Sequence, residues 1–184
     1  MKVFWSVRGV FTTRKIVLMG LLVALTAVFA MFLEIYLTPQ QRLFSFSYLP
    51  GALASMLFGP WAGLFVGFGG DFLGWLIKPG KGVYFPGFAL SAMLQNLIYA
   101  VFFYRRSSVP DKPVKALLRA LLAQTAVLII INLGLNMMWL NVMYGRTAGE
   151  MYSLFNVALK LAQFPIDIGL LTGLCYLRRR IPQL

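Results

Sequence analysis

LPGALASMLFGPWAGLFVGFGGDFLGWLI, residues 49–77, runs through two apolar stretches and meets its first charged residue only at Asp71. The break FGPWAG, residues 58–63, contains no charge and indicates a tight, partly buried turn between two helices. A carboxylate at the centre of a membrane helix costs about 2.5–3.5 kcal/mol on insertion scales. We therefore expect Asp71 to have a specific role.

The composition of the chain is that of a membrane protein. Hydrophobic residues make up 60% of the 184 residues and charged residues 12%, with a mean hydropathy of +0.78. Soluble domains have roughly 25% charged residues. Backbone that crosses lipid must satisfy its own hydrogen bonds, and the alternation typical of a membrane barrel is absent. The sequence therefore predicts one all-α membrane domain over residues 1–184.

Six apolar segments are separated by charged residues, Pro and Gly. They cover residues 16–33, 46–58, 61–77, 86–104, 116–138 and 152–177. Crossing a typical bilayer core takes about 20 residues. The second segment therefore either includes the preceding LFSF, residues 43–46, or spans only where other helices surround it. The pattern predicts six transmembrane helices.

The basic residues predict the orientation of these helices. Twelve of the seventeen fall into three clusters, which six spans place on one side of the membrane: Lys2, Arg8, Arg14, Lys15, Arg105, Arg106, Lys112, Lys115, Arg119, Arg178, Arg179 and Arg180. The positive-inside rule makes that side cytoplasmic, so both termini are expected in the cytoplasm. A cleaved signal peptide is disfavoured, because its loss would leave an odd number of spans.

Several polar side chains occur within the predicted spans at similar depths near the outer face. Asp71 lies seven residues before Lys78, or about 10 Å below the outer surface. The others are Ser91, Gln95, Asn132, Asn136 and Lys160. Their agreement in depth predicts a ligand pocket that opens to the outside. The alternatives are hydrogen bonds between neighbouring helices and, for Asp71 with Lys160, a structural ion pair.

The three predicted outer loops are rich in aromatic residues. They are EIYLTPQQRLFSFSYLP at 34–50, PGKGVYFPGF at 79–88 and WLNVMYGRTAGE at 139–150. Aromatic faces with a few cations suit a planar, anionic organic molecule, whereas the alternative for Trp139 is the interfacial belt. The predicted substrate-binding residues are Arg42, Phe44, Asp71, Lys78, Tyr84, Phe88, Ser91, Gln95, Asn132, Asn136, Trp139 and Lys160.

Residues that could carry catalysis or bind a metal are scarce. The chain has no His and one Cys, and Asp71 and Asp167 are the carboxylates within the predicted spans. Asp167 is expected near the cytoplasmic half, far from Asp71. We expect no enzymatic activity, no metal, no cofactor and no nucleic-acid partner.

The sequence also bears on how uptake would be energised. It contains no GxxxxGK[ST] phosphate loop, so uphill uptake would need partner subunits that hydrolyse ATP. Gly20 and Ala24 form a small-xxx-small pair in the first segment, which allows close approach of a second helix in lipid. We expect this pair to dock a partner, with packing inside the same subunit as the alternative. A stand-alone facilitator or channel is the competing kind of transport protein.

Several motifs between residues 42 and 104 point to one protein family. They are MLFGP at 56–60, the Gly70–Asp71 pair, and YFPGF at 84–88 followed by LSA at 90–92. NMMWLNVMYG at 136–145 and the region of Pro165 extend the match. The stretch resembles the membrane-embedded substrate-binding S component of energy-coupling factor (ECF) vitamin transporters, most of all the folate branch.

The resemblance implies a fold, a site and partners. It implies six helices and an outward-facing pocket for a vitamin, roofed by the three outer loops. It also implies a complex with a transmembrane coupling subunit and two cytoplasmic ATPase subunits, in the bacterial cytoplasmic membrane. The function expected from it is high-affinity capture of folate for import.

One position departs from the folate branch, which usually has Arg nine residues before the Pro of the sixth helix. This chain has Asn156 there, and Lys160 follows one turn later. Either Lys160 replaces the missing cation, or the substrate is another vitamin such as cobalamin.

Overall fold

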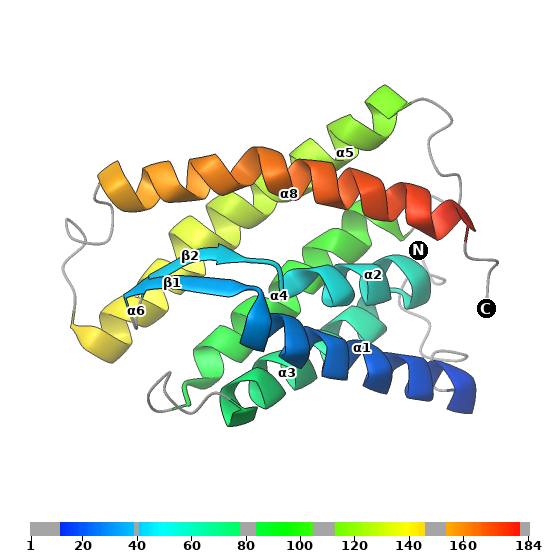
Figure 1. Cartoon of the computed structure of the whole chain (residues 1–184), viewed down its shortest axis with the longest axis horizontal. Coiled ribbons are helices and arrows are strands. Elements are labelled where there is room, and N and C mark those ends of the chain that lie inside the picture. Colours follow the sequence, from blue (N-terminus) through cyan, green and yellow to red (C-terminus); the bar gives the residue numbers. More distant parts are fainter. Residues whose placement is uncertain (1–11, 39–40, 78–83, 105–112, 146–153, 181–184) are drawn as a thin grey trace.

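The computed structural model describes residues 12–38, 41–77, 84–104, 113–145 and 154–180. Its elements, in chain order, are α1 (Thr13–Phe32), β1 (Glu34–Thr38), β2 (Gln41–Ser45), α2 (Tyr48–Phe58), α3 (Pro60–Ile77), α4 (Pro86–Phe103), α5 (Pro113–Ala126), the π-helix η2 (Val127–Leu135), α6 (Asn136–Tyr144) and α8 (Leu154–Arg180) (Figure 1). Since α5, η2 and α6 run on without a break, the described helices form six segments. The predicted six-helix, all-α membrane fold is confirmed.

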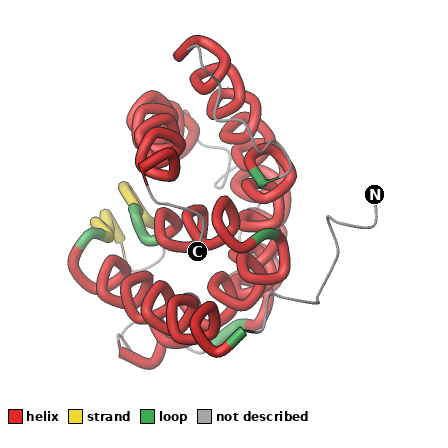
Figure 2. The backbone as a smooth tube through the Cα atoms, turned by 90° about the vertical axis from the view of Figure 1, so that its right-hand side faces the viewer, coloured by secondary structure: helices red, strands yellow, loops and turns green. Residues whose placement is uncertain are grey.

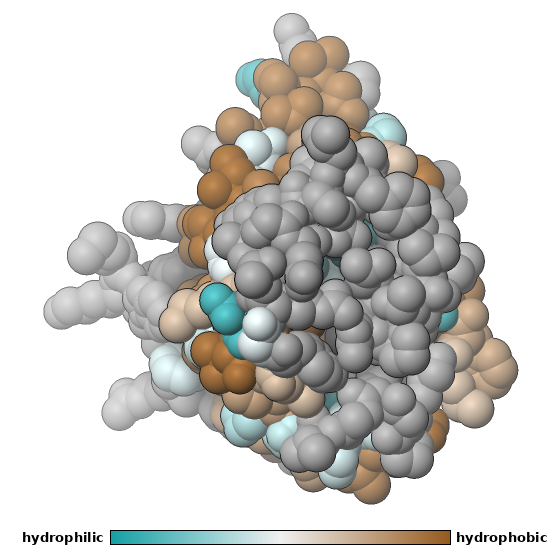
Figure 3. Space-filling model, turned by 90° about the vertical axis from the view of Figure 1, so that its left-hand side faces the viewer, coloured by the Kyte–Doolittle hydropathy of each residue, from teal (hydrophilic) through white to brown (hydrophobic). Residues whose placement is uncertain are grey.

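The lengths and ends of the helices agree with membrane crossing. Thr13–Phe32, Pro86–Phe103 and Val114–Met143 are each long and apolar enough to span a bilayer. α1 begins and α8 ends at the same end of the bundle (Figure 1). Seen from the opposite end, hydrophobic surface shows at several places along the rim of the molecule (Figure 3). Many large hydrophobic side chains are exposed, among them Leu21, Phe65 and Leu122, as expected where lipid surrounds a protein.

The short helix α2 lies in the middle of the bundle. It contacts α1, α3, α4 and α8, and Figure 2 shows the other helices around it. Ala52, Ala54, Ser55 and Met56 are fully buried. An 11-residue helix is too short to cross a bilayer core alone. The sequence alternative in which the second segment is surrounded by other helices therefore describes α2.

The turn predicted at FGPWAG is confirmed. α2 ends at Phe58 and α3 begins at Pro60, so a single residue, Gly59, joins them. Gly59 has φ 96°, which favours glycine, and a Cβ there would lie 2.9 Å from the ring of Tyr104. Pro60 suits the first helical position because no intrahelical donor is needed there. The turn thus reverses the chain in the shortest possible distance.

Close packing of α2, α3 and α4 depends on glycines around Asn96. A Cβ added at Gly51 or Gly67 would lie 2.6 or 2.7 Å from the Asn96 side chain. Close helix approach through small residues is the usual way in which membrane helices associate. The position of α4 against the hairpin of α2 and α3 therefore depends on the absence of side chains at these positions.

The first outer loop differs from the expectation. Residues Glu34–Thr38 and Gln41–Ser45 form an antiparallel hairpin, with Glu34 paired to Ser45 and Ile35 to Phe44. Of the two alternatives for the second segment, the extension by LFSF is therefore wrong, because Leu43, Phe44 and Ser45 belong to β2. At the base of the hairpin Glu34 Oε1 accepts hydrogen bonds from Ser45 (3.1 Å) and Ser47 (2.8 Å). Strand pairing satisfies backbone groups that a loop at this depth would leave without partners.

The fifth segment is longer than predicted. It remains helical to Tyr144, six residues beyond the expected end, because the first residue that favours termination is Gly145, with φ 61°. Trp139 therefore belongs to α6 and not to an outer loop. The π-helical residues 127–135 replace the i→i+4 bonding pattern with i→i+5, a feature found often at functional sites.

The packing at Asn96 gives a stability prediction. Gly67→Ala should lower the stability of the folded protein by about 1–3 kcal/mol, because the new methyl group would also lie 2.9 Å from the backbone oxygen of Ala92. Thermal unfolding in detergent would measure the change. Gly173→Ala in α8 is the matched control: its Cβ meets nothing within 4 Å, so the melting temperature should stay the same or rise. Equal shifts for both variants would contradict the packing argument.

Candidate functional site

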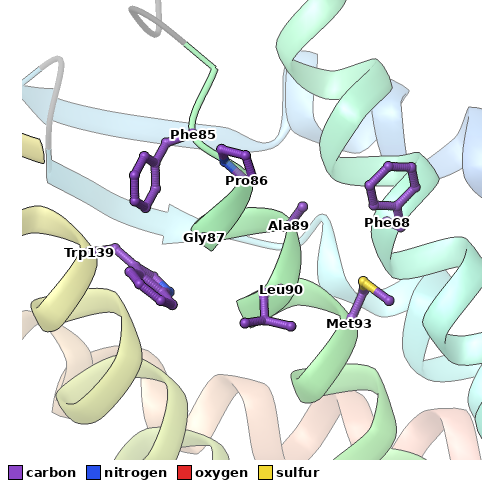
Figure 4. A pocket seen from close by; sticks show the side chains of 8 residues that line it. All are labelled: Phe68, Phe85, Pro86, Gly87, Ala89, Leu90, Met93 and Trp139. Carbon is purple, nitrogen blue, oxygen red and sulfur yellow. The ribbon is translucent and has the colours of Figure 1, made fainter. Parts of the chain in front are cut away.

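An apolar cavity of about 480 Å³ lies between α3, the start of α4 and α6. This volume is typical of sites for small organic molecules, which range from about 300 to 1,000 Å³. Figure 4 shows Phe85 and Trp139 on one side of it and Phe68 and Met93 on the other. The remaining lining residues are Pro86, Gly87, Ala89 and Leu90. The cavity offers aromatic faces and no charge from these eight residues.

The aromatic wall of the cavity is held by specific contacts. The indole N–H of Trp139 donates a hydrogen bond to Ser91 Oγ at 3.1 Å, and the rings of Phe85 and Trp139 lie 5.6 Å apart. A Cβ at Gly87 would overlap the Phe85 ring and lie 2.6 Å from Trp139 Cδ2. Because its N–H is already bound to Ser91, Trp139 contributes an apolar ring surface to the cavity.

Asp71 lies near the connection between α3 and α4. Burial raises the pKa of the nearby Tyr84 phenol, and the negative charge of Asp71 raises it further. The Tyr84 ring packs edge-on against Phe72 at 5.6 Å and lies 5.2 Å from Trp75. Within the described part of the chain, the Tyr84 hydroxyl is buried without a hydrogen-bond partner. This group therefore combines a carboxylate with a buried hydroxyl.

Asn132 and Asn136 lie on the widened stretch of the fifth segment. Asn132 belongs to η2, and Asn136 is the first residue of α6. The Asn136 Oδ1 atom is buried and, among the described residues, has no hydrogen-bond donor. Buried polar atoms without partners are rare in proteins, so this oxygen is a candidate acceptor for a ligand N–H.

A network around Asp167 is the main feature that sequence reasoning missed. Asp167 Oδ1 accepts from the Tyr48 hydroxyl at 2.7 Å and from Gln163 Nε2 at 3.2 Å, and Oδ2 accepts from Gln124 Nε2 at 2.7 Å. The positive charge of Lys160 also acts on this carboxylate. A signal was present in the sequence, because Lys160, Gln163 and Asp167 recur at the spacing of one helical face.

The same network reaches the hairpin and α4. Gln163 Nε2 also donates to the Ser45 backbone carbonyl at 3.0 Å. On the other side, Gln124 Oε1 accepts from the Tyr99 hydroxyl at 3.0 Å, and the Tyr99 oxygen accepts from Gln95 Nε2 at 3.1 Å. Gln95, a predicted substrate-binding residue, is therefore connected to Asp167.

The remaining predicted residues are placed as follows. Arg42 and Phe44 lie in strand β2, but their side chains are outside the described part of the structure, as is the whole of Lys78. Phe88 lies in the first turn of α4, with its ring 5.9 Å from that of Phe85. Gly20 and Ala24 lie on the exposed side of α1, and a Cβ at Gly20 would meet nothing within 4 Å.

The predicted residues thus form two groups of contacts. Asp71 lies beside Tyr84 on the side of α3, whereas Ser91 lies against Trp139 and Gln95 against Tyr99 on one face of α4. Lys160 interacts electrostatically with Asp167, which lies on the same helix. The expectation that these residues converge in a substrate pocket stays a prediction.

Comparison with known proteins identifies related chains. A family model described as the substrate-specific component of ECF transporters matches residues 14–175. The protein named Folate transporter FolT from Clostridium novyi (strain NT) is 35% identical over 155 residues, 84% of each chain. Folate transporter FolT from Leuconostoc mesenteroides subsp. mesenteroides is 30% identical over 164 residues, 86% of this chain and 82% of that protein.

A solved structure is similar as well. It is a crystal structure of FolT bound with folic acid, with a TM-score of 0.77 and 33% sequence identity. The match covers 89% of this chain and 95% of that chain. The two chains therefore share the whole fold and not a local motif.

The neighbourhood of Tyr84 gives a titration prediction. Asp71→Asn should lower the pKa of Tyr84, because a nearby negative charge disfavours the phenolate and its removal favours it. Ultraviolet titration of phenolate absorbance would measure this, with Tyr84→Phe prepared in both backgrounds to isolate the signal of Tyr84. An identical Tyr84 midpoint with Asp or Asn at position 71 would show that the charge does not reach the phenol.

Proposed function

Because this chain belongs to the family of substrate-specific components of ECF transporters, we propose that it captures folate from outside the cell and delivers it for import. The family is a class of transport subunit and not a class of enzyme. The chain is accordingly a multi-pass membrane protein whose task is to bind a solute.

One observation carries the choice of folate. The structure of FolT with folic acid matches nearly the whole chain at 33% identity and a TM-score of 0.77. Two further relatives are named folate transporters. The departure at Asn156 leaves one alternative open, an S component for another vitamin. Direct titration of the purified protein with folate distinguishes a folate-binding subunit from this alternative.

The outer half of the molecule supports this choice chemically. Folate combines flat rings with hydrogen-bonding edges and an anionic end. Aromatic faces such as those of Phe85 and Trp139 suit the rings. Asp71, the Tyr84 hydroxyl and Asn136 Oδ1 provide polar groups for the ring edges. Arg42, Lys78 and Lys160 are the proposed partners of the carboxylates.

We assign partners and location as part of the same proposal. The chain would act with a transmembrane coupling subunit and two ATPase subunits in the bacterial cytoplasmic membrane, because it carries no phosphate loop of its own. The exposed side of α1 at Gly20 and Ala24 supports close approach of a partner helix.

The proposed function gives a prediction for Asp71. If its carboxylate accepts hydrogen bonds from the donor edge of a pterin-like ring, Asp71→Asn should weaken folate binding by about 1.5–3 kcal/mol, or roughly ten- to over a hundredfold. Calorimetric titration of folate into the purified variants would measure this.

Two further variants complete that titration. Thr125→Ala is a matched control, because its hydroxyl bonds to the Leu121 carbonyl of its own helix, and its affinity should equal that of the parent. Lys160→Met should weaken binding of folate more than binding of an analogue without the carboxylates. Parental affinity in Asp71→Asn would remove this carboxylate from the proposed site.

A second prediction concerns coupling to the partners. Gly20→Leu with Ala24→Leu should abolish close packing against another helix, so transport should fall while folate binding to the isolated subunit persists. Gly169→Leu is the matched control on α8, where an added Cβ also meets nothing within 4 Å. Parallel loss of binding and transport would instead assign the pair to the fold of the subunit.

A third prediction concerns orientation. We propose that both termini and the connection at residues 105–115 are cytoplasmic, because twelve of the seventeen basic residues fall on that side of six spans. A thiol introduced at Asp111 should therefore resist an impermeant maleimide in intact cells and react after lysis. Labelling in intact cells would reverse the assignment.

A further inference from the structure

A continuous line of hydrogen bonds joins the carboxylate of Asp167 to the side chain of Gln95. It passes from α8 through Gln124 of α5 to Tyr99 of α4, with distances of 2.7, 3.0 and 3.1 Å. Asp167, Gln124 and Tyr99 are buried, whereas Gln95 is partly exposed. The line therefore begins at buried residues and ends at a residue that is partly exposed.

The chemistry of the carboxylate fixes the direction of every bond in this line. An ionised carboxylate can only accept, so Gln124 must turn its amino group to Asp167 and its carbonyl to Tyr99. Tyr99 then uses its single proton on Gln124, and its oxygen accepts from the amino group of Gln95. The carbonyl oxygen of Gln95 takes no part in the line.

A second contact fixes the other side of Asp167. Gln163 Nε2 donates to the backbone carbonyl of Ser45, which can only accept, and the same nitrogen lies 3.2 Å from Asp167 Oδ1. The hydroxyl of Tyr48 donates to the same oxygen, so the atom at the Oδ1 position must be a hydrogen-bond acceptor. A side chain at position 167 that has one donor and one acceptor should therefore turn its donor toward Gln124.

Gln95 lies on α4 between two residues that make hydrogen bonds to other helices. Ser91, Gln95 and Tyr99 follow one another at intervals of four residues, so they share one face of α4. Ser91 is bound to Trp139 of the cavity wall, and Tyr99 is bound to Gln124. Gln95 lies between Ser91 and Tyr99 in sequence and, unlike them, is partly exposed.

We propose that Asp167 is a positioning residue for substrate specificity: through Gln124 and Tyr99 it orients Gln95 so that its carbonyl oxygen accepts a hydrogen bond from an N–H edge of the substrate. The proposal rests on the proposed function, since it deepens the description of the same substrate site. A carbonyl oxygen of Gln95 held in this way favours ligands whose ring carries amino or ring N–H groups. It disfavours ligands that present oxygen or unprotonated nitrogen at the same place.

The proposal can be tested by moving the carboxylate from residue 167 to residue 95, at the other end of the hydrogen-bond line. In Asp167→Asn the amide oxygen stays with Tyr48 and Gln163, so the amino group faces Gln124 and the whole line reverses. Gln95 then presents its amino group to the substrate. In Gln95→Glu both ends accept, and the single proton of Tyr99 cannot serve both. In the double variant Asp167→Asn/Gln95→Glu, the line runs in the reversed direction and again ends in an acceptor.

Calorimetric titration with folate should follow this pattern. Asp167→Asn and Gln95→Glu should each weaken binding about tenfold or more, and the double variant should return to within about threefold of the parent. Thr172→Val on α8, which loses a bond to the Ile168 carbonyl of its own helix, should bind as the parent does. Losses that multiply in the double variant would overturn the proposal, because a purely structural Asp167 predicts no recovery.

Thermal unfolding without ligand separates this inference from the identity of the vitamin. The proteins compared are the parent, the two single variants and the double variant. Gln95→Glu should lower the melting temperature of the parent and should not lower that of Asp167→Asn. Additive shifts would overturn the hydrogen-bond line whatever the protein binds. Coupled shifts in a parent that does not bind folate would retain the line and reject the proposed substrate.

Discussion

The buried carboxyl group of Asp167 imposes a strict condition on this fold, because polar atoms in the interior of a membrane protein need hydrogen-bond partners within the protein. Its donors come from three elements: Tyr48 at the start of α2, Gln124 in α5 and Gln163 in α8 itself. Gln163 also binds the Ser45 carbonyl, so the end of β2 is held by the same group. The relative positions of α2, α5, α8 and the hairpin are therefore linked through one side chain.

Packing around α2 supplies the complementary constraint. Glycines at positions 51 and 67 allow the Asn96 side chain to lie between three helices, and a one-residue turn at Gly59 keeps α2 and α3 together. Lipid offers no hydrophobic gain for helix association, so close van der Waals contact takes its place.

Binding chemistry follows from these two constraints. The aromatic wall of the cavity is rigid, because Trp139 is bound to Ser91 and packed against Phe85, and it suits the flat rings of a vitamin. Specificity requires polar groups whose donor or acceptor character is fixed before the ligand arrives. A carboxylate can fix that character at a distance, since each amide and hydroxyl in its hydrogen-bond line has one remaining orientation.

The sequence by itself determined the membrane class, the six helices, the turn at FGPWAG and the family resemblance, because apolar length, charge and glycine placement act locally. It also selected Ser91, Gln95 and Trp139, which stand out as polar or aromatic residues in apolar surroundings. Only the tertiary structure decided that residues 34–45 form a hairpin, that Trp139 belongs to a helix and that Asp167 is the centre of a network. The hairpin pairs residues at most 11 positions apart, but the network joins partners 25, 43 and 119 residues apart along the chain. No local pattern identifies which distant donor reaches a given oxygen.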